Sequence, residues 1–343
     1  MTVGAPRSVE ELEHRLSEPT DAAVDALRAI PGDIVILGAG GKMGPSLAAM
    51  ARRAADRTGV PRRVVAVSRF SSPGVASWLA AQGVEVLPSE LGEPRNWAGL
   101  PDAPNVIFMA GNKFGTTNAP GRTWFTNTVV PALAAARYRT SRIVVFSTGN
   151  VYALTPVSRG GSRESDAPAP VGEYAMSCLG RERVFEHAAL AWGTRSAILR
   201  LNYAVDLRYG VVVDIGQKVR SGTPVDVGMG WVNCIWQGDA SAAALVALGW
   251  CTAPVTVVNL TGPEVLPVRQ VAATLAARFG VEPTFTGTES PDALLSHTGL
   301  LHSLMGPPQV PAAQLVEWVA DWLVAGGETS GKATRFELRT GAF

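Results

Sequence analysis

A short apolar strand that runs directly into closely spaced glycines constrains this chain more than any other feature. The apolar run 34–37 is followed by Gly38, Gly41 and Gly44, and a helix-compatible segment begins at once. In such a unit the first glycine permits a tight turn, the second lets the backbone approach a pyrophosphate, and the third lets the helix pack close to the strand. The helix N-terminus adds amide donors and partial positive charge. The stretch therefore predicts a bound dinucleotide.

Strands and helices alternate over most of the 343 residues. Apolar runs predict strands at residues 34–37, 63–67, 84–87, 105–109, 142–147, 196–201 and 255–260. Helical periodicity predicts helices at residues 44–56, 73–82, 123–138, 174–192, 212–220, 238–249 and 267–279. This alternation favours an α/β fold with a doubly wound parallel (Rossmann) sheet, in which ligands bind at the carboxyl ends of the strands.

Breaks in the alternation indicate how the chain is divided. The start of the chain looks helical and is split by Pro19, which is typical of an arm packed on a larger domain. We expect an N-terminal helical arm over 1–30, a dinucleotide-binding domain over 31–204 to which strand 255–260 returns, a smaller substrate-binding region over 205–254 and 261–328, and a polar C-terminal tail over 329–343.

Composition argues against several classes of function. Lys and Arg (30) balance Asp and Glu (29), and basic residues are not interleaved with aromatics, so we expect no nucleic-acid partner. No apolar run reaches bilayer length and the first residues lack a signal-peptide core, which favours a cytoplasmic protein without a membrane partner. The spacing of the three cysteines and four histidines fits no metal site. A small-molecule substrate is the remaining expectation.

The end of the second predicted strand bears on the cofactor. Dinucleotide folds usually place an acid there for the ribose 2′-hydroxyl, whereas this chain has Ser68 and Arg69. A hydroxyl followed by a guanidinium suits a 2′-phosphate, because arginine binds phosphate bidentately, and Lys42 in the glycine loop offers a second positive charge. NADP is therefore our first choice and NAD the second. An ordinary exposed side chain is the alternative interpretation of Arg69.

Two later strands end in residues suited to cofactor and substrate chemistry. The fourth strand runs into the small-residue stretch Met109–Gly111, which lets a cofactor pass close to the backbone. The fifth strand ends at Ser147 and Thr148, and Tyr174 follows 26 residues after Thr148 on a predicted helix. These strand ends should lie along one edge of the sheet.

This order of motifs resembles the extended short-chain dehydrogenase/reductase family, which includes NAD-dependent sugar epimerases and dehydratases. The resemblance covers almost the whole chain. The glycines match the family's G-x-x-G-x-x-G, and Ser147–Tyr152 looks like its serine/threonine strand end. The resemblance implies cofactor contacts from Gly38, Gly40, Gly41, Lys42, Met43, Gly44, Ser68, Arg69, Glu90, Leu91, Met109, Ala110, Gly111, Asn127, Ser147, Tyr174 and Asn202. It suggests substrate contacts from Thr148, Asn150, Tyr203 and Arg208.

One departure from the family falls on the catalytic residues. The resemblance makes Tyr174 the acid and base and Thr148 the hydroxyl that polarises the reacting oxygen, but the lysine expected four residues after the tyrosine is Cys178. In the family that lysine binds the nicotinamide ribose, and its charge lowers the tyrosine pKa so that a phenolate accepts the substrate proton. The neutral thiol of Cys178 supplies neither the contact to the ribose nor the positive charge. We interpret Cys178 as a small buried residue at the catalytic position rather than as a nucleophile.

Lys113 is our candidate for the missing positive charge, because its loop should border the nicotinamide end of the cofactor. A contact to the cofactor loop or a solvated side chain is the alternative. A second departure, Gly149 and Asn150 in place of an acid pair after the threonine, disfavours sugar-nucleotide 4,6-dehydration.

The sequence thus favours an NAD(P)-dependent oxidoreductase or epimerase that transfers hydride at a hydroxyl-bearing carbon of a carbohydrate, sugar acid or related polyol. Net redox chemistry and epimerisation fit equally well. The missing lysine motivates two alternatives, a dinucleotide-binding sensor and a non-redox lyase or isomerase. By resemblance, the helical segments 124–137 and 174–192 are expected to form a homodimer interface.

Overall fold

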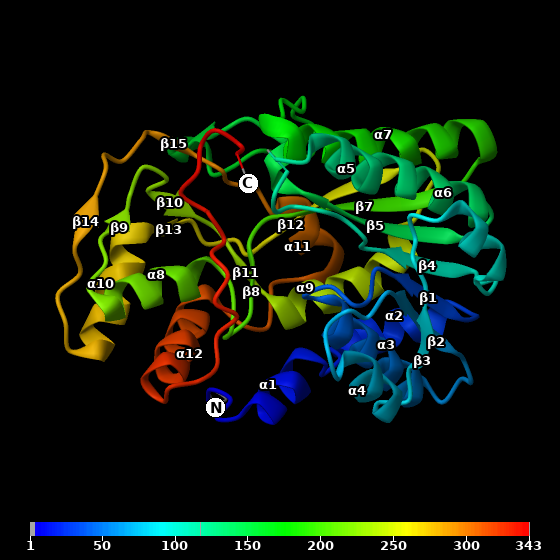
Figure 1. Ribbon diagram of the computed structural model, residues 1–343, viewed down its shortest axis with the longest axis horizontal. Coiled ribbons are helices and arrows are strands. Elements are labelled where there is room, and N and C mark those ends of the chain that lie inside the picture. Colours follow the sequence, from blue (N-terminus) through cyan, green and yellow to red (C-terminus); the bar gives the residue numbers. More distant parts are fainter. Residues whose placement is uncertain (1–3, 117, 343) are drawn as a thin grey trace.

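A seven-stranded parallel sheet forms the centre of the protein, which a computed structural model describes over residues 4–116 and 118–342 (Figure 1). The strand order is β12-β7-β5-β4-β1-β2-β3, and every neighbouring pair is parallel. The strands are β1 (Ile34–Leu37), β2 (Val64–Ser68), β3 (Glu85–Pro88), β4 (Asn105–Phe108), β5 (Arg142–Thr148), β7 (Arg195–Leu201) and β12 (Thr256–Leu260). The doubly wound α/β fold predicted from the sequence is confirmed.

Helices cover both faces of this sheet, which explains why its central strands are apolar at consecutive positions. In β1, Ile34 and Ile36 face a core formed with α2, α3 and α9, whereas Val35 and Leu37 face a core formed with α6 and α7. These helices are α2 (Asp21–Ala29), α3 (Gly44–Thr58), α9 (Gln237–Val246), α6 (Val130–Arg137) and α7 (Gly172–Trp192). Helix α4 (Val75–Ala81) adds Leu79 to the first core.

A separate core holds the second half of the molecule together. It lies between α8 (Val211–Ser221), α10 (Val268–Phe279) and α12 (Ala312–Val324), with Trp236 and Trp318 in edge-to-face contact, their ring centroids 5.4 Å apart. Three pairs of short strands lie around it: β8 (Ala204–Val205) with β11 (Ile235–Trp236), β9 (Val225–Asp226) with β14 (Phe285–Thr286), and β10 (Trp231–Val232) with β13 (Leu266–Pro267). A fourth pair, β6 (Thr155–Pro156) with β15 (Asp292–Ala293), places Ala293 in a smaller apolar cluster.

Most predicted elements appear within a few residues of their expected bounds. The segment predicted as one helix over 123–138 is α5 (Pro120–Trp124), a π-helical turn η2 (Phe125–Val129) and α6. Helix α11 (Gly299–Met305) and helix α12 were not predicted. Short 3₁₀ segments lie at η1 (Pro94–Gly99), η3 (Gly149–Val151), η4 (Val157–Arg159) and η5 (Ala247–Trp250).

The N-terminal arm connects the two halves instead of packing on one of them. Helix α1 (Val9–Leu16) places Leu12 and Leu16 in the core of the second half, whereas α2 belongs to the core under the sheet. The break at Pro19 is capped by Thr20, whose hydroxyl accepts a hydrogen bond of 3.1 Å from the Ala23 N–H and starts α2. The structure also differs from the expected division at α9, which packs under the sheet and not in the substrate-binding region.

The C-terminal tail is ordered by specific contacts. Phe336 is buried in the core of the second half, and the backbone N–H of Thr334 donates to the Asp214 carboxylate at 2.6 Å. Figure 1 shows the tail (red) running from α12 across the face of the molecule toward α7. Near its end Gly341 packs on Val171 and Gly172, which start the helix that carries Tyr174.

Among the described residues, no helix has both the length and the apolar character needed to cross a membrane. The same residues contain no cluster of three or more His, Cys, Asp or Glu side chains arranged to hold a metal ion.

Candidate active site

The glycine loop between β1 and α3 has the tight geometry that its sequence predicts. Gly38 has φ of +89°, and a Cβ there would lie 2.5 Å from the Ala110 N, so the loop is pressed against the end of β4. A Cβ on Gly44 would lie 2.3 Å from the Ala39 carbonyl oxygen. Gly41, by contrast, is exposed, and a Cβ there would meet only the Gly38 oxygen at 3.5 Å. The loop is therefore open to a ligand on one side, and it fits a dinucleotide pyrophosphate.

The residues expected to bind an NADP 2′-phosphate are arranged differently from the prediction. Ser68 does lie at the loop, because its Oγ would be 2.7 Å from a Cβ on Gly40. Arg69, however, forms an ion pair with Glu90 at 3.4 Å, and both side chains are exposed. Glu90 also accepts a hydrogen bond of 3.1 Å from the Gly92 N–H. A carboxylate at this place repels a phosphate, so the expectation of NADP is not supported. Leu91 is buried in the core and cannot line the cofactor site with its side chain.

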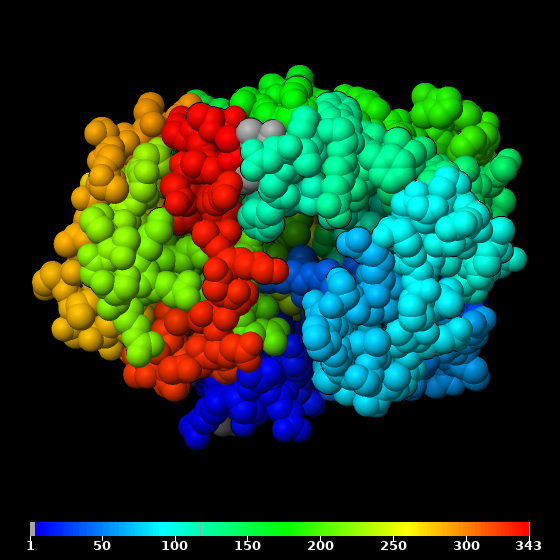
Figure 2. All heavy atoms as spheres, in the orientation of Figure 1, coloured from blue at the N-terminus to red at the C-terminus, as the bar shows by residue number. Residues whose placement is uncertain are grey.

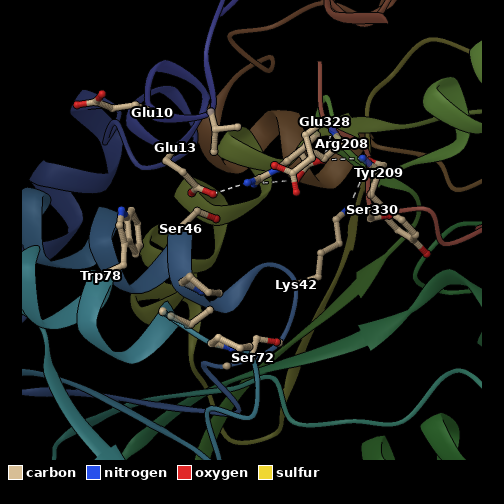
Figure 3. A pocket seen from close by; sticks show the side chains of 18 of the residues that line it. Glu10, Glu13, Lys42, Ser46, Ser72, Trp78, Arg208, Tyr209, Glu328 and Ser330 are labelled. Atoms are coloured by element: carbon tan, nitrogen blue, oxygen red, sulfur yellow. Dashed lines mark hydrogen bonds and ion pairs between the residues drawn. The ribbon is translucent and has the colours of Figure 1, made fainter. Parts of the chain in front are cut away.

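Lys42 also points away from Arg69. Its Nζ lies 3.3 Å from the Ala204 carbonyl oxygen in the second half of the molecule. It also lies 4.1 Å from the centre of the ring of Tyr209, toward which Lys42 extends in Figure 3. Desolvation by the surrounding protein lowers the pKa of Lys42 to about 8, and the nearby charges of Arg208 and Lys113 lower it further, against the attraction of Asp206. Lys42 therefore connects the glycine loop to the other half. Met43, the next residue, is buried at the start of α3.

Tyr174 and Thr148 meet as the sequence predicts. The Tyr174 hydroxyl is hydrogen-bonded to the side chains of Thr148 and Cys178, so the three residues form one group at the carboxyl end of β5. Thr148 also accepts a hydrogen bond of 3.2 Å from the Asn150 N–H. Burial raises the pKa of Tyr174 far above its ordinary value, and the adjacent Cys178 raises it further; the positive charge of Arg181 acts in the opposite direction. Phenolate formation therefore needs a cation nearby.

Lys113 is close enough to influence this group. Its Nζ lies 6.0 Å from the centre of the Tyr174 ring and 5.5 Å from that of Phe114. Desolvation lowers the pKa of Lys113 to about 8, against the attraction of Asp214 and Cys178. The loop after β4 thus brings an ammonium group near Tyr174.

That loop is held by Asn127 on the π-helical turn η2. The buried Asn127 side chain accepts from the Asn112 N–H at 2.9 Å, donates to the Asn112 carbonyl at 3.0 Å, and donates to Ser177 Oγ at 2.9 Å. Met109 and Ala110 lead into the loop, and Gly111 packs against the Arg181 guanidinium. In this arrangement Asn127 positions the loop, which differs from the direct cofactor contact that the resemblance implied.

Other predicted site residues are engaged in structural contacts. Ser147 donates to the buried Glu182 carboxylate at 2.5 Å. Asn202 is buried and donates to Asn233 Oδ1 at 2.8 Å. The Tyr203 hydroxyl lies 3.4 Å from the Phe336 carbonyl oxygen under the C-terminal tail. The structure does not bring these side chains to Tyr174.

Arg208 is also committed elsewhere. It forms an ion pair with Glu13 of α1 at 2.6 Å, which Figure 3 shows from close by. It also pairs with Asp206 at 3.4 Å. Its charge is thereby balanced by two carboxylates, and a substrate phosphate would have to displace one of them.

Two charged residues that the sequence reasoning missed lie on the buried face of α7. Glu182 is fully buried and pairs with Arg200 at 2.7 Å, and Arg200 in turn donates to the Tyr152 hydroxyl at 2.6 Å. Arg181 is 5% exposed. Their spacing in the sequence could have identified them, because positions 181 and 182 follow Tyr174 by two helical turns and so share its face of the helix.

A cleft of about 1220 Å³ opens beside the glycine loop. Figure 2 shows a hollow near the middle of this face, bordered by the C-terminal tail on one side and by blue and cyan residues on the other. The cleft is lined by segments far apart in the chain: Val9–His14 of α1, the loop 40–42, residues 72–78 of α4 and its approach, residues 206–209, and residues 328–332.

Comparison with known proteins places this architecture. No protein-family model and no curated protein sequence matches the chain. Many solved structures share its fold at low sequence identity, and three of them illustrate the likeness. UDP-glucose 4-epimerase from Thermotoga maritima, with UDP-glucose, is 16% identical with a TM-score of 0.69, over 86% of this chain and 99% of its own. UDP-glucose 4-epimerase from Thermus thermophilus, with NAD, is 18% identical with a TM-score of 0.67, over 84% and 98%.

A UDP-glucuronic acid 4-epimerase from Bacillus cereus, in complex with a fluorinated substrate analogue and NAD, is 16% identical with a TM-score of 0.69, over 85% of this chain and 99% of its own. In each case nearly the whole of the solved chain is matched, so the likeness extends beyond the central sheet. The chain therefore has the fold of the extended short-chain dehydrogenases/reductases that its sequence resembles.

Proposed function

We propose that the protein is an NAD-dependent epimerase that inverts a hydroxyl-bearing carbon of a nucleoside-diphosphate sugar. The observation that carries the proposal is the hydrogen-bonded group of Tyr174, Thr148 and Cys178 at the carboxyl end of β5, on the edge of the sheet that carries the glycine loop. Tyr174 accepts the proton of the sugar hydroxyl and later returns it, while Thr148 holds the same oxygen. When bound, NAD supplies the hydride acceptor and donor for this chemistry.

The choice of NAD rests on two supports. The Arg69–Glu90 ion pair puts a carboxylate where a 2′-phosphate would lie, and Lys42 is turned toward the opposite half. Two of the three structures described above contain NAD. Gly38, Gly41 and Gly44 would hold the pyrophosphate, and Ser68 would lie beside the adenosine ribose.

The choice of a UDP-sugar rests on likeness, because two of the structures described above were solved with UDP-glucose or with a fluorinated UDP-glucuronic acid. Lys113 also supports the proposed chemistry of Tyr174. Its ammonium group lies near the Tyr174 ring, where its positive charge favours the phenolate form of Tyr174. In this role it replaces the lysine that the family has at the position of Cys178. Above its pKa of about 8 this support is lost, so we infer an upper limit to the active pH range.

We further infer that the protein forms a homodimer through α5, η2 and α7. Large apolar side chains are exposed on these helices, where water would otherwise cover them, at Trp124, Phe125, Val129, Met176 and Trp192.

Turnover on defined sugars tests the proposed function. The enzyme with NAD is incubated with UDP-glucose, UDP-galactose or UDP-glucuronic acid, and NMR follows the ring protons while absorbance follows reduced nucleotide. We expect the epimer to accumulate without net NADH. Tyr174→Phe removes the proton acceptor and should lower turnover by roughly 10²–10⁴-fold while NAD affinity is retained.

Other outcomes identify the alternatives. Stoichiometric NADH would show a net oxidoreductase. Tight NAD binding with no product from any of the sugars would favour a dinucleotide-binding sensor and contradict the proposal.

A further inference from the structure

Arg181 occupies the place from which a positive charge could replace the lysine that is absent at position 178. It follows Tyr174 by seven residues on α7, and Cys178 lies between them on the same helical face. Long side chains on a helix lean toward its N-terminus, which here is the end that carries Tyr174. The short Cys178 leaves room for the Arg181 side chain to extend along this face.

The Arg181 guanidinium is fixed at the ends of the two central strands. Its Nη1 donates to the Phe146 carbonyl of β5 at 2.7 Å, and its Nη2 donates to Asn127 Oδ1 at 2.8 Å. A Cβ on Gly111 would lie only 2.7 Å from Nη2, so glycine is needed for this close approach. The guanidinium thus holds the loop after β4 in place through its hydrogen bond to Asn127 and its close packing on Gly111.

Among the described residues, this buried cation has no carboxylate paired with it. Within residues 4–116 and 118–342, Arg181 is in no ion pair, because its neighbour Glu182 is turned to Arg200 and Ser147. Its Nε has no hydrogen-bond partner in the same part of the chain. Burying an unpaired charge is costly, and such a charge is retained where its field serves a purpose.

The field of Arg181 acts on Tyr174 and Cys178, whose pKa values it lowers against the effect of burial. The groups that face the Tyr174 side chain are Thr148 from β5, Lys113 from the loop after β4, and Cys178 and Arg181 from α7 itself. Of the two cations, Lys113 loses its charge above about pH 8, whereas arginine keeps its charge throughout the working pH range.

We propose that Arg181 is a positioning residue that supplies, from the next turns of α7, the permanent positive charge missing at Cys178, favouring the Tyr174 phenolate and holding the loop after β4. The inference rests on the proposed function, because it assumes that Tyr174 works as a phenolate. It adds a role for a residue outside the usual pattern of the family.

The test separates charge from structure. Arg181→Gln keeps hydrogen-bond donors but removes the charge, and Arg181→Lys keeps the charge. Arg183→Gln is the matched control, since Arg183 lies on the exposed side of α7 and pairs with Glu186. In each background the ultraviolet absorbance of tyrosinate is titrated with saturating NAD, and the same titration of a Tyr174→Phe variant is subtracted. Thermal unfolding confirms that each variant is folded.

We expect the Tyr174 midpoint to rise by roughly one pH unit or more in Arg181→Gln, to return close to wild type in Arg181→Lys, and to stay unchanged in Arg183→Gln. A folded Arg181→Gln that titrates as wild type would overturn the inference. So would a wild-type complex in which Tyr174 does not titrate, because no phenolate would form. The measurement needs no turnover, so failure of the proposed epimerase activity would be seen separately.

Discussion

Lys113→Met should make the protein more stable and less active. In the wild-type protein desolvation lowers the pKa of Lys113 from 10.5 to about 8, because the folded chain holds the ammonium group near the rings of Tyr174 and Phe114. At 1.36 kcal/mol per pH unit this difference corresponds to about 3.4 kcal/mol of destabilisation by the charged form. Lys113 is only partly buried, and water screens part of this penalty, so about half of it is a reasonable expectation.

The dependence on pH follows from the proton balance. Between about pH 8 and 10.5 the unfolded chain binds more protons at Lys113 than the folded chain does, so wild-type stability rises with pH in this window. Methionine keeps most of the apolar contacts with the two rings and carries no charge. The advantage of Lys113→Met is therefore complete below pH 8 and vanishes above about 10.5.

Thermal unfolding of the nucleotide-free protein measures the effect. For 343 residues the unfolding entropy is about 0.7 kcal/mol/K, so a gain of about 1–3 kcal/mol raises Tm by roughly 1.5–4 °C near pH 7. Lys332→Met, at an exposed lysine of the tail, is the control and should leave Tm unchanged. Turnover of Lys113→Met should fall roughly tenfold or more, as the phenolate of Tyr174 loses a nearby cation. The reasoning would be refuted if Lys113→Met did not raise Tm, or if the rise in Tm did not change with pH.

Two further predictions concern stability and assembly. Glu182→Ala leaves the Arg200 charge buried and unpaired, and should lower the free energy of unfolding by about 3–5 kcal/mol, or Tm by about 4–7 °C. Replacing both Glu182 and Arg200 by methionine should restore much of this stability. A loss for Glu182→Ala no larger than that of the surface variant Glu186→Ala would contradict the role of the pair. Phe125→Asp should convert the proposed dimer to monomers in sedimentation analysis, whereas Val281→Asp, at an equally exposed apolar residue, should not. An unchanged mass for Phe125→Asp would exclude the surface of α5, η2 and α7 as the dimer interface.

The sequence alone was sufficient wherever the structural cause is local. The strand, glycine turn and helix of 34–58 lie within 25 residues, and the positive φ of Gly38 and the close packing of Gly44 on Ala39 are properties of that short stretch. The central strands are buried on both faces, so their apolar runs identified them without knowledge of their neighbours. The contact of Tyr174 with Thr148 followed from the family resemblance.

The direction of each charged side chain was decided by tertiary structure. Lys42 reaches the carbonyl of a residue 162 positions away, and Arg208 pairs with a glutamate 195 positions away. Arg69 has an acidic partner on the next strand end. Charged side chains are long and go where a partner compensates their desolvation, and that partner is set by the packing of distant segments. The sequence by itself therefore located the glycine loop at which we propose that a dinucleotide binds. Only the tertiary structure decided which cations face it, and that Arg181 and Lys113 share the surroundings of Tyr174, because electrostatic compensation depends on distances in space.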